Sequence, residues 1–237
     1  MLDETKAPDT IDIPATQDRL IEQAFNELIA SRDPSKDPNG TNFRPLAVIL
    51  SDTKILEVPT NWTDDSSKET NLRILGETCL VEGCYRIILI NDVVFKTYAQ
   101  KPDTLTEQPL CYPPSMRKEG LILSYIDFKD SKKNLFRVYP YKFTENTLVK
   151  EATIDFTHQN IMALDSFMMT NISYGFTRAA MLDMMQKKEL LNQSFSLEFG
   201  DKMLKEVLAE FPGATLGKDL LGGRDEVEEL DDEDLDI

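Results

Sequence analysis

Few residues of this chain have the types and spacing that catalysis requires. The 237 residues include one histidine, His158. A Ser-His-Asp or Cys-His arrangement would have to use this imidazole, yet no Gly-X-Ser-X-Gly elbow or other nucleophile signature accompanies it. We therefore interpret His158 as a helix-cap or surface residue and predict no catalytic residue.

The cysteine and glycine spacings argue against a metal site and a phosphate-binding loop. Cys79 and Cys84 are separated by four residues, but no second Cys or His pair completes a tetrahedral site, so core thiols are the better interpretation. Residues 213–219 place three residues between two glycines, and Asp219 stands where a phosphate loop needs a hydroxyl. We predict no cofactor and no metal.

Residues 225–237, called here the acidic segment, hold nine carboxylates and no Lys or Arg. They lack the turn and ligand cage that a calcium loop needs. One interpretation is a solubilising, disordered tail. The other is a tethered peptide whose apolar side chains enter a partner's basic-rimmed pocket. In the second case the predicted partner-binding residues are Leu230, Leu235, Asp236 and Ile237.

Aromatic and basic residues alternate in a hairpin predicted over residues 119–143. Two runs of β-branched and aromatic residues flank a polar cluster, residues 129–133, which indicates a turn. Single-stranded nucleic acid is bound by aromatic faces next to cations, while aromatic strand residues also form cores, and both interpretations stay open. The candidate nucleic-acid-binding residues are Tyr125, Lys129, Lys132, Lys133, Phe136, Arg137, Tyr139 and Lys142.

Methionines are concentrated in the second half of the chain, with seven of the nine between Met162 and Met203. Thioethers repack easily, so a Met-rich helix face suits an adaptable binding groove, but such residues fill cores more often. Adjacent pairs such as Met168 and Met169 cannot all face one way. We expect most to be core and some to lie at an interface.

Apolar periodicity predicts the elements that would carry these residues. Strands are expected over residues 45–51, 54–58, 84–98 and 148–156 besides the hairpin, with Asn91 and Asp92 as a turn or bulge in the third. Helices are expected over residues 14–32, 67–83, 159–170, 177–193 and 199–211.

This order predicts an α+β fold. A largely antiparallel sheet surrounds the central hairpin, with an N-terminal helix and a C-terminal helical segment. The expected organisation is a flexible acidic arm (1–13), an α+β core (14–156), a helical segment packed on that core (157–212) and a flexible acidic tail (213–237).

Composition limits the compartment and the partners. The formal charge of −16 opposes non-specific adhesion to nucleic acid or anionic lipid. No apolar run reaches membrane length, no signal peptide is visible, and three cysteines are an odd number. We predict no membrane association and a cytoplasmic protein, which would mean the host cytoplasm for a viral one.

Two resemblances accompany these residues. Residues 222–237 resemble the acidic C-terminal tips of single-stranded DNA-binding proteins, which end in a short apolar residue and recruit replication partners. That resemblance implies a protein partner. The order helix, hairpin, helix, strands over residues 16–143 resembles uncharacterised small proteins encoded by bacteriophages, and it implies no mechanism.

Three functional hypotheses follow. The first is a non-enzymatic accessory or assembly protein that binds another protein through its acidic segment and its Met-rich helices. The second is a single-stranded nucleic-acid-binding protein whose acidic segment competes for the basic hairpin. The third is a metal-independent enzyme without a readable motif.

Overall fold

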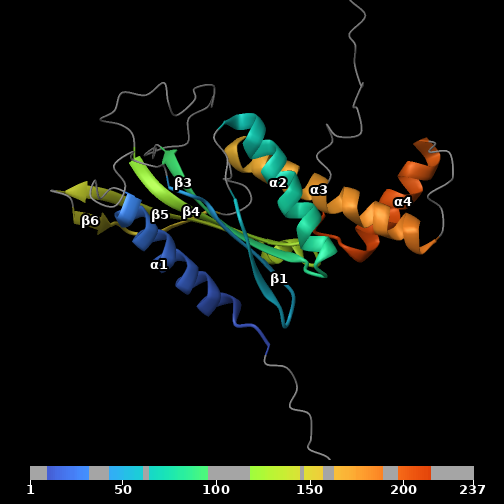
Figure 1. Ribbon diagram of the computed structural model, residues 1–237, viewed down its shortest axis with the longest axis horizontal. Coiled ribbons are helices and arrows are strands. Elements are labelled where there is room, and N and C mark those ends of the chain that lie inside the picture. Colours follow the sequence, from blue (N-terminus) through green and yellow to red (C-terminus); the bar gives the residue numbers. More distant parts are fainter. Residues whose placement is uncertain are drawn as a thin grey trace, which may run out of the picture.

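The computed structural model describes residues 10–31, 43–60, 64–95, 118–144, 147–156, 163–188 and 197–214. Within these ranges the chain has the predicted α+β architecture (Figure 1). The helices are α1 (Ile13–Ser31), α2 (Asp65–Val81), α3 (Ala163–Lys187) and α4 (Leu197–Glu210). The strands are β1 (Leu46–Leu50), β2 (Ile55–Val58), β3 (Arg86–Phe95), β4 (Lys118–Asp127), β5 (Leu135–Thr144), β6 (Thr147–Lys150) and β7 (Ile154–Phe156).

The strands form one antiparallel sheet in the order β2-β1-β3-β4-β5-β6, and β7 pairs with another part of β5. The predicted hairpin is confirmed as β4 and β5, and β4 lies beside β3 at the centre of the sheet. Asn91 and Asp92 form neither a turn nor a bulge, because β3 pairs with β4 without a break in register from Arg86 to Phe95.

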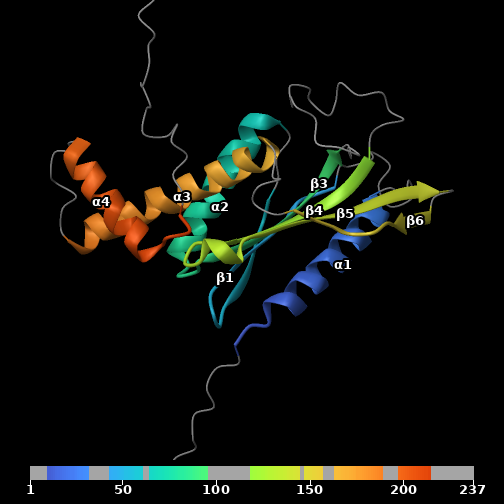
Figure 2. The ribbon, with the colours of Figure 1, turned by 180° about the vertical axis from the view of Figure 1, so that it is seen from behind.

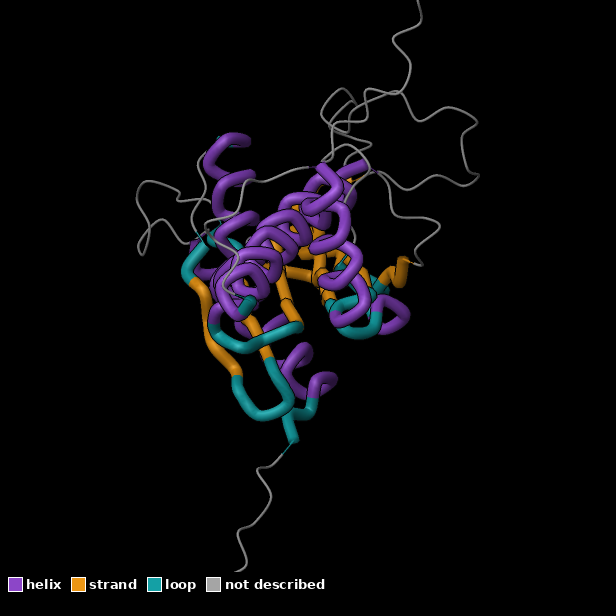
Figure 3. Tube along the Cα trace, turned by 90° about the vertical axis from the view of Figure 1, so that its right-hand side faces the viewer, coloured by secondary structure: helices purple, strands orange, loops and turns teal. Residues whose placement is uncertain are grey.

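Helices cover both faces of the sheet (Figures 1 and 3). The apolar stripe of α1, which includes Leu20, Ala24 and Phe25, packs against Ile88 of β3 and Leu121 of β4. The opposite face packs against α2 and α3. Two separate cores result, since successive side chains of a strand point to opposite faces.

The core on the α2 and α3 side includes Ile87 and Ile126 of the sheet, Leu75 of α2 and Ile172 of α3. Helices α2 and α3 lie side by side in both ribbon views (Figures 1 and 2). In the same views, α4 lies at the end of the molecule away from β6.

Glycines allow α2 and α3 to approach closely. A Cβ on Gly76 of α2 would lie within 3.0 Å of the Ile172 carbonyl oxygen, and a Cβ on Gly175 of α3 within 3.0 Å of the Arg73 carbonyl oxygen. Real Cβ atoms do not come this close to backbone. The two backbones therefore touch at a crossing that only glycine accommodates.

The second half of the chain differs from the prediction. Residues 163–187 form one continuous helix rather than two, because the predicted break around Asn171 and Gly175 is where α3 packs on α2. The strand predicted over residues 148–156 is two short strands, β6 and β7, which pair with different parts of β5.

Two residues assigned to the tail belong to the folded body. Gly213 and Ala214 are buried, and the Gly213 amide donates a 2.7 Å hydrogen bond to the Phe128 carbonyl oxygen.

Among the helices within the described ranges, none combines the length and apolarity that a bilayer crossing needs.

Candidate functional site

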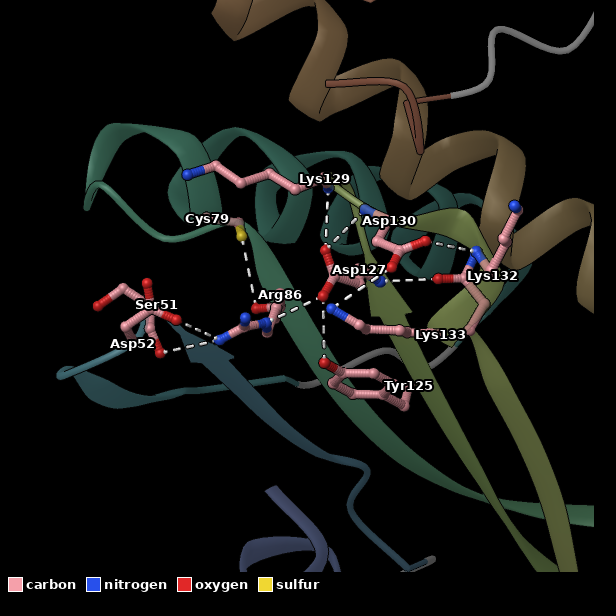
Figure 4. Close-up of polar contacts among 11 residues, drawn as sticks. Ser51, Asp52, Cys79, Arg86, Tyr125, Asp127, Lys129, Asp130, Lys132 and Lys133 are labelled. Carbon is pink, nitrogen blue, oxygen red and sulfur yellow. Dashed lines mark hydrogen bonds and ion pairs between the residues drawn. The ribbon is translucent and has the colours of Figure 1, made fainter. Parts of the chain in front are cut away.

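A buried carboxylate, Asp127, lies at one end of the sheet together with three other ionisable side chains (Figure 4). The end of β4 supplies Tyr125 and Asp127, the start of β3 supplies Arg86, and the β1–β2 turn supplies Asp52. We call these four residues the ion cluster. Asp127 is only 1% exposed, which is costly for a carboxylate unless it is paired and hydrogen-bonded.

Four donors surround the Asp127 carboxylate. The backbone amides of Lys129 and Asp130 donate to Oδ1 at 2.9 and 3.0 Å. The Arg86 Nε donates to Oδ2 at 3.0 Å, and the Tyr125 hydroxyl lies 3.4 Å from the same oxygen. A carboxylate offers about four lone-pair positions, so its capacity is filled by the chain itself.

Arg86 joins three elements. Besides Asp127, its guanidinium donates to Asp52 Oδ1 at 3.0 Å and to the Ser51 carbonyl oxygen at 3.5 Å, both in the β1–β2 turn. It also lies over the Tyr85 ring, 4.5 Å from the ring centroid. The side chain is 15% exposed, so the cation is largely shielded from water but fully paired.

The cluster shifts the pKa values of its neighbours. Burial, followed by a hydrogen bond to Asp52, raises the pKa of Tyr85 to about 12. Burial and the negative charge of Asp127 raise the pKa of Tyr125 above its ordinary value. Hydrogen bonds from Tyr85 and Arg86 lower the pKa of Asp52. Both phenols therefore stay protonated at neutral pH, and neither is activated as a base or a nucleophile.

A carboxylate with every lone pair occupied suits structure rather than proton transfer. A general base must present a free lone pair to the proton that it takes. Here Asp127 holds the β4–β5 turn through two amides and holds β3 through Arg86. The ion cluster is a clamp between the two central strands and two turns.

The structure divides the eight predicted nucleic-acid-binding residues among different surfaces. Tyr125 and Phe136 are buried, at 5% and 2% exposed, so neither ring face is open to a base. Tyr139 is half-buried against the α1-side core. Tyr139 and Arg137 pair with Leu121 and Leu123, which belong to that core.

The basic members separate in the same way. Lys142 alternates with Tyr141 and lies on the other face of the sheet from Arg137. Arg137 is paired with Asp155, and Lys142 lies 3.6 Å from Glu151. Lys129, Lys132 and Lys133 lie together at the β4–β5 turn. One continuous stack of bases would not meet all eight residues.

The methionines of the described helices belong mainly to the core. Met168, Met185 and Met203 are buried, at 2%, 8% and 1% exposed. Three more are half-buried against the same core, namely Met169, Met181 and Met184. These six thioethers are therefore buried or half-buried rather than exposed.

Of the other residues considered from the sequence, the structure describes the two cysteines but not the histidine or the partner-binding candidates. Cys79 and Cys84 are buried free thiols, as predicted, and burial raises the pKa of both. Within the part of the chain that the structure covers, no three His, Cys, Asp or Glu side chains could hold a metal. His158 and the partner-binding candidates lie outside the described residues. Those candidates are Leu230, Leu235, Asp236 and Ile237.

The ion cluster was missed by sequence reasoning. Arg86 and Asp127 are 41 residues apart, so no local spacing connects them. A usable signal existed nevertheless. Each stands at one end of a mainly apolar run, Arg86 at the start of β3 and Asp127 at the end of β4, and neighbouring antiparallel strands bring such ends together.

Comparisons of this chain with family models, with curated proteins and with solved structures found no match. The resemblance of residues 222–237 to the tips of single-stranded DNA-binding proteins, and that of residues 16–143 to bacteriophage proteins, therefore stay predictions.

Proposed function

We propose that this protein acts by binding another protein through its acidic segment. The observation that carries the proposal is the segregation of charge: residues 225–237 hold nine carboxylates and no cation. Apolar side chains, including Leu230, Leu235 and Ile237, alternate with these charges. Such a peptide fits a partner whose apolar pocket has a basic rim.

The fold supports this proposal by fixing the start of the tether. Phe211 is followed by a turn in which Gly213 is hydrogen-bonded to Phe128 and Ala214 is 1% exposed. The acidic segment thus connects to the folded body, at the β4–β5 end of the sheet, through residues 215–224. A partner held by the segment would be kept near this end.

The other hypotheses receive less support from the described residues. The nucleic-acid hypothesis needs aromatic faces beside free cations, whereas Tyr125 and Phe136 are buried and Arg137 is paired with Asp155. The Met-rich helices give their thioethers mainly to the core. An enzyme that used Asp127 would have to break bonds that hold two central strands together.

Affinity capture with designed variants tests the proposal. The full chain is compared with a deletion of residues 225–237 and with the triple variant Leu230→Ser, Leu235→Ser, Ile237→Ser, which keeps every carboxylate. We expect the partner to be lost with the deletion and at least tenfold weaker with the triple variant, about 1.4 kcal/mol. Far-UV circular dichroism and the thermal midpoint of each variant should match those of the full chain.

Two controls separate the contributions of charge and apolar contact. The variant Asp231→Asn, Asp232→Asn, Asp234→Asn keeps the apolar residues and should weaken capture mainly at low salt. A fluorescent single-stranded oligonucleotide should bind neither the full chain nor the deletion variant. Undiminished capture by the deletion variant would refute the proposal, and salt-sensitive oligonucleotide binding by it would favour the nucleic-acid hypothesis.

A further inference from the structure

The β4–β5 turn presents three lysines on a rigid base. We call Lys129, Lys132 and Lys133 the basic turn. All three side chains are exposed, and the stretch 129–133 contains one carboxylate, Asp130, against three cations. The surplus of two positive charges stands in a chain whose net charge is −16.

Backbone hydrogen bonds fix the shape of this turn. Asp127 accepts from the amides of Lys129 and Asp130, and Asp130 accepts from the amide of Lys132 at 3.2 Å. The Asn134 side chain accepts from the Asp127 amide at 2.8 Å. Because side chains of the turn satisfy its backbone groups, the lysine Cα positions are set before any ligand arrives (Figure 4).

Two of the three lysines of the basic turn are not neutralised by an ion pair with a described residue. In the part of the chain that the structure covers, neither Lys129 nor Lys132 makes an ion pair, while Lys133 lies 3.4 Å from Asp130. The Lys129 ammonium sits over the Tyr85 ring, 3.9 Å from its centroid, which orients it without neutralising it. The turn therefore offers cations that an acidic peptide can contact.

The chain passes directly beside this turn on its way to the acidic segment. Gly213 approaches the turn so closely that a Cβ there would lie within 3.0 Å of the Asp127 carbonyl oxygen. Its amide bonds to Phe128, the residue before Lys129. The stretch that leads to the acidic segment therefore begins next to the basic turn.

The connection is short enough to favour contact. Ten residues, 215–224, lie between Ala214 and Asp225. The eleven Cα–Cα steps from Ala214 to Asp225 would span about 18 Å on average as a random coil, and at most about 38 Å when extended. A tether of this kind gives an effective concentration of about 1 mM, so contacts of millimolar strength suffice to populate a docked state.

We propose that the acidic segment docks on the basic turn of its own chain when no partner is bound. The proposal rests on the function proposed above. The same carboxylates of the segment would bind either Lys129 and Lys132 of their own chain or the basic rim of a partner. Docking occupies carboxylates of the segment and thereby lowers its apparent affinity for a partner. Salt weakens the docking, because the lysines are exposed.

Nuclear magnetic resonance of the full chain tests the proposal without any partner. We expect the amide resonances of residues 129–134 to differ between the full chain and the deletion of residues 225–237. The difference should shrink as NaCl is raised from about 20 mM to about 500 mM. In the variant Lys129→Gln, Lys132→Gln the same deletion should shift these resonances much less.

A matched control lies at the opposite end of the same strands. The variant Lys118→Gln, Lys142→Gln removes the same charge from β4 and β5, where both lysines contact Glu151 at 3.7 and 3.6 Å. It should leave the shift at residues 129–134 unchanged. A shift lost equally in both variants would overturn the proposal in favour of a general charge effect.

Two further outcomes separate the docking proposal from the proposed function. Identical spectra of the full chain and the deletion variant at low salt would overturn docking while leaving partner capture by the segment intact. Conversely, docking without loss of capture on deletion would refute the proposed function alone. If both proposals hold, Lys129→Gln, Lys132→Gln should bind the captured partner more tightly than the full chain does.

Discussion

At the scale of single residues, the most informative feature is a buried carboxylate that is fully satisfied. Asp127 is bound by two backbone amides, by Arg86 and by Tyr125, so its charge is compensated although the side chain is buried. Removing one partner of a buried pair leaves the other uncompensated, which costs far more than the pair itself contributes. The ion cluster is thus sensitive to substitution.

The substitution Asp127→Asn should destabilise the fold by about 3–5 kcal/mol. The amide cannot neutralise Arg86, and its NH₂ group would face donors. Asp52→Asn is the matched control, because its side chain is 63% exposed and an exposed ion pair contributes about 1 kcal/mol or less. Urea unfolding measures both. Equal losses in the two variants would contradict the assignment of Asp127 as the clamp.

Tyr85 and Tyr125, two of the buried phenols, predict a loss of stability at alkaline pH. The folded state holds the Tyr85 proton up to a pKa of about 12, against 10.0 in the unfolded chain. Their contribution is therefore intact below pH 10 and falls as the pH rises towards 12. Tyr125→Phe should make this fall less steep. An unchanged slope in Tyr125→Phe would contradict the prediction.

At the scale of elements, contact between α2 and α3 depends on two residues without a side chain. Gly76 and Gly175 bring the two backbones together, and this contact lets Leu75 and Ile172 reach one core. Glycine in a helix costs about 1 kcal/mol relative to alanine. Close packing of the helices offsets that cost.

The substitution Gly76→Ala should destabilise the protein by about 1–3 kcal/mol although alanine favours helices, because the new methyl group forces the helices apart. Gly83→Ala provides a contrast. Nothing lies within 4 Å of a Cβ at Gly83, where φ is +68°, so its cost of about 1–2 kcal/mol comes from the backbone alone. Thermal unfolding of both variants checks this. A stabilised Gly76→Ala would show that the crossing tolerates a Cβ.

At the scale of the whole molecule, a sheet covered on both faces carries its charge unevenly. The central strands β3 and β4 contribute to both cores, whereas β2 and β6 are the edges of the sheet. The acidic segment holds nine of the sixteen net negative charges. The folded body is therefore much closer to neutral than the chain.

Hydrogen exchange should follow this layering. Amides of β3 and β4, bonded on both sides and covered on both faces, should exchange slowest, at rates set by global unfolding. Amides of β6, a four-residue edge strand, should exchange much faster. Mass spectrometry of peptic fragments resolves these strands. Deleting residues 225–237 should leave the order unchanged, and comparable rates in β4 and β6 would contradict the layered core.

Local patterns predicted the fold where a single periodicity decided the structure. Leu20, Ala24 and Leu28 recur at helical spacing and form the buried stripe of α1. The polar cluster between the two aromatic runs correctly predicted the β4–β5 turn. Local patterns did not predict α3 as one continuous helix. Asn171 and Gly175 have low helix propensity, but the packing of α3 on α2 outweighs that propensity.

The sequence by itself determined the α+β class, the strand–turn–strand of the hairpin and the uneven charge, since each depends on neighbouring residues. Only the tertiary structure decided which aromatic rings are buried, because strand alternation defines two faces without saying what covers them. It alone joined Arg86 to Asp127 and brought Gly213 beside the basic turn. Contacts between residues distant in the chain depend on strand order and register, and no local spacing records either.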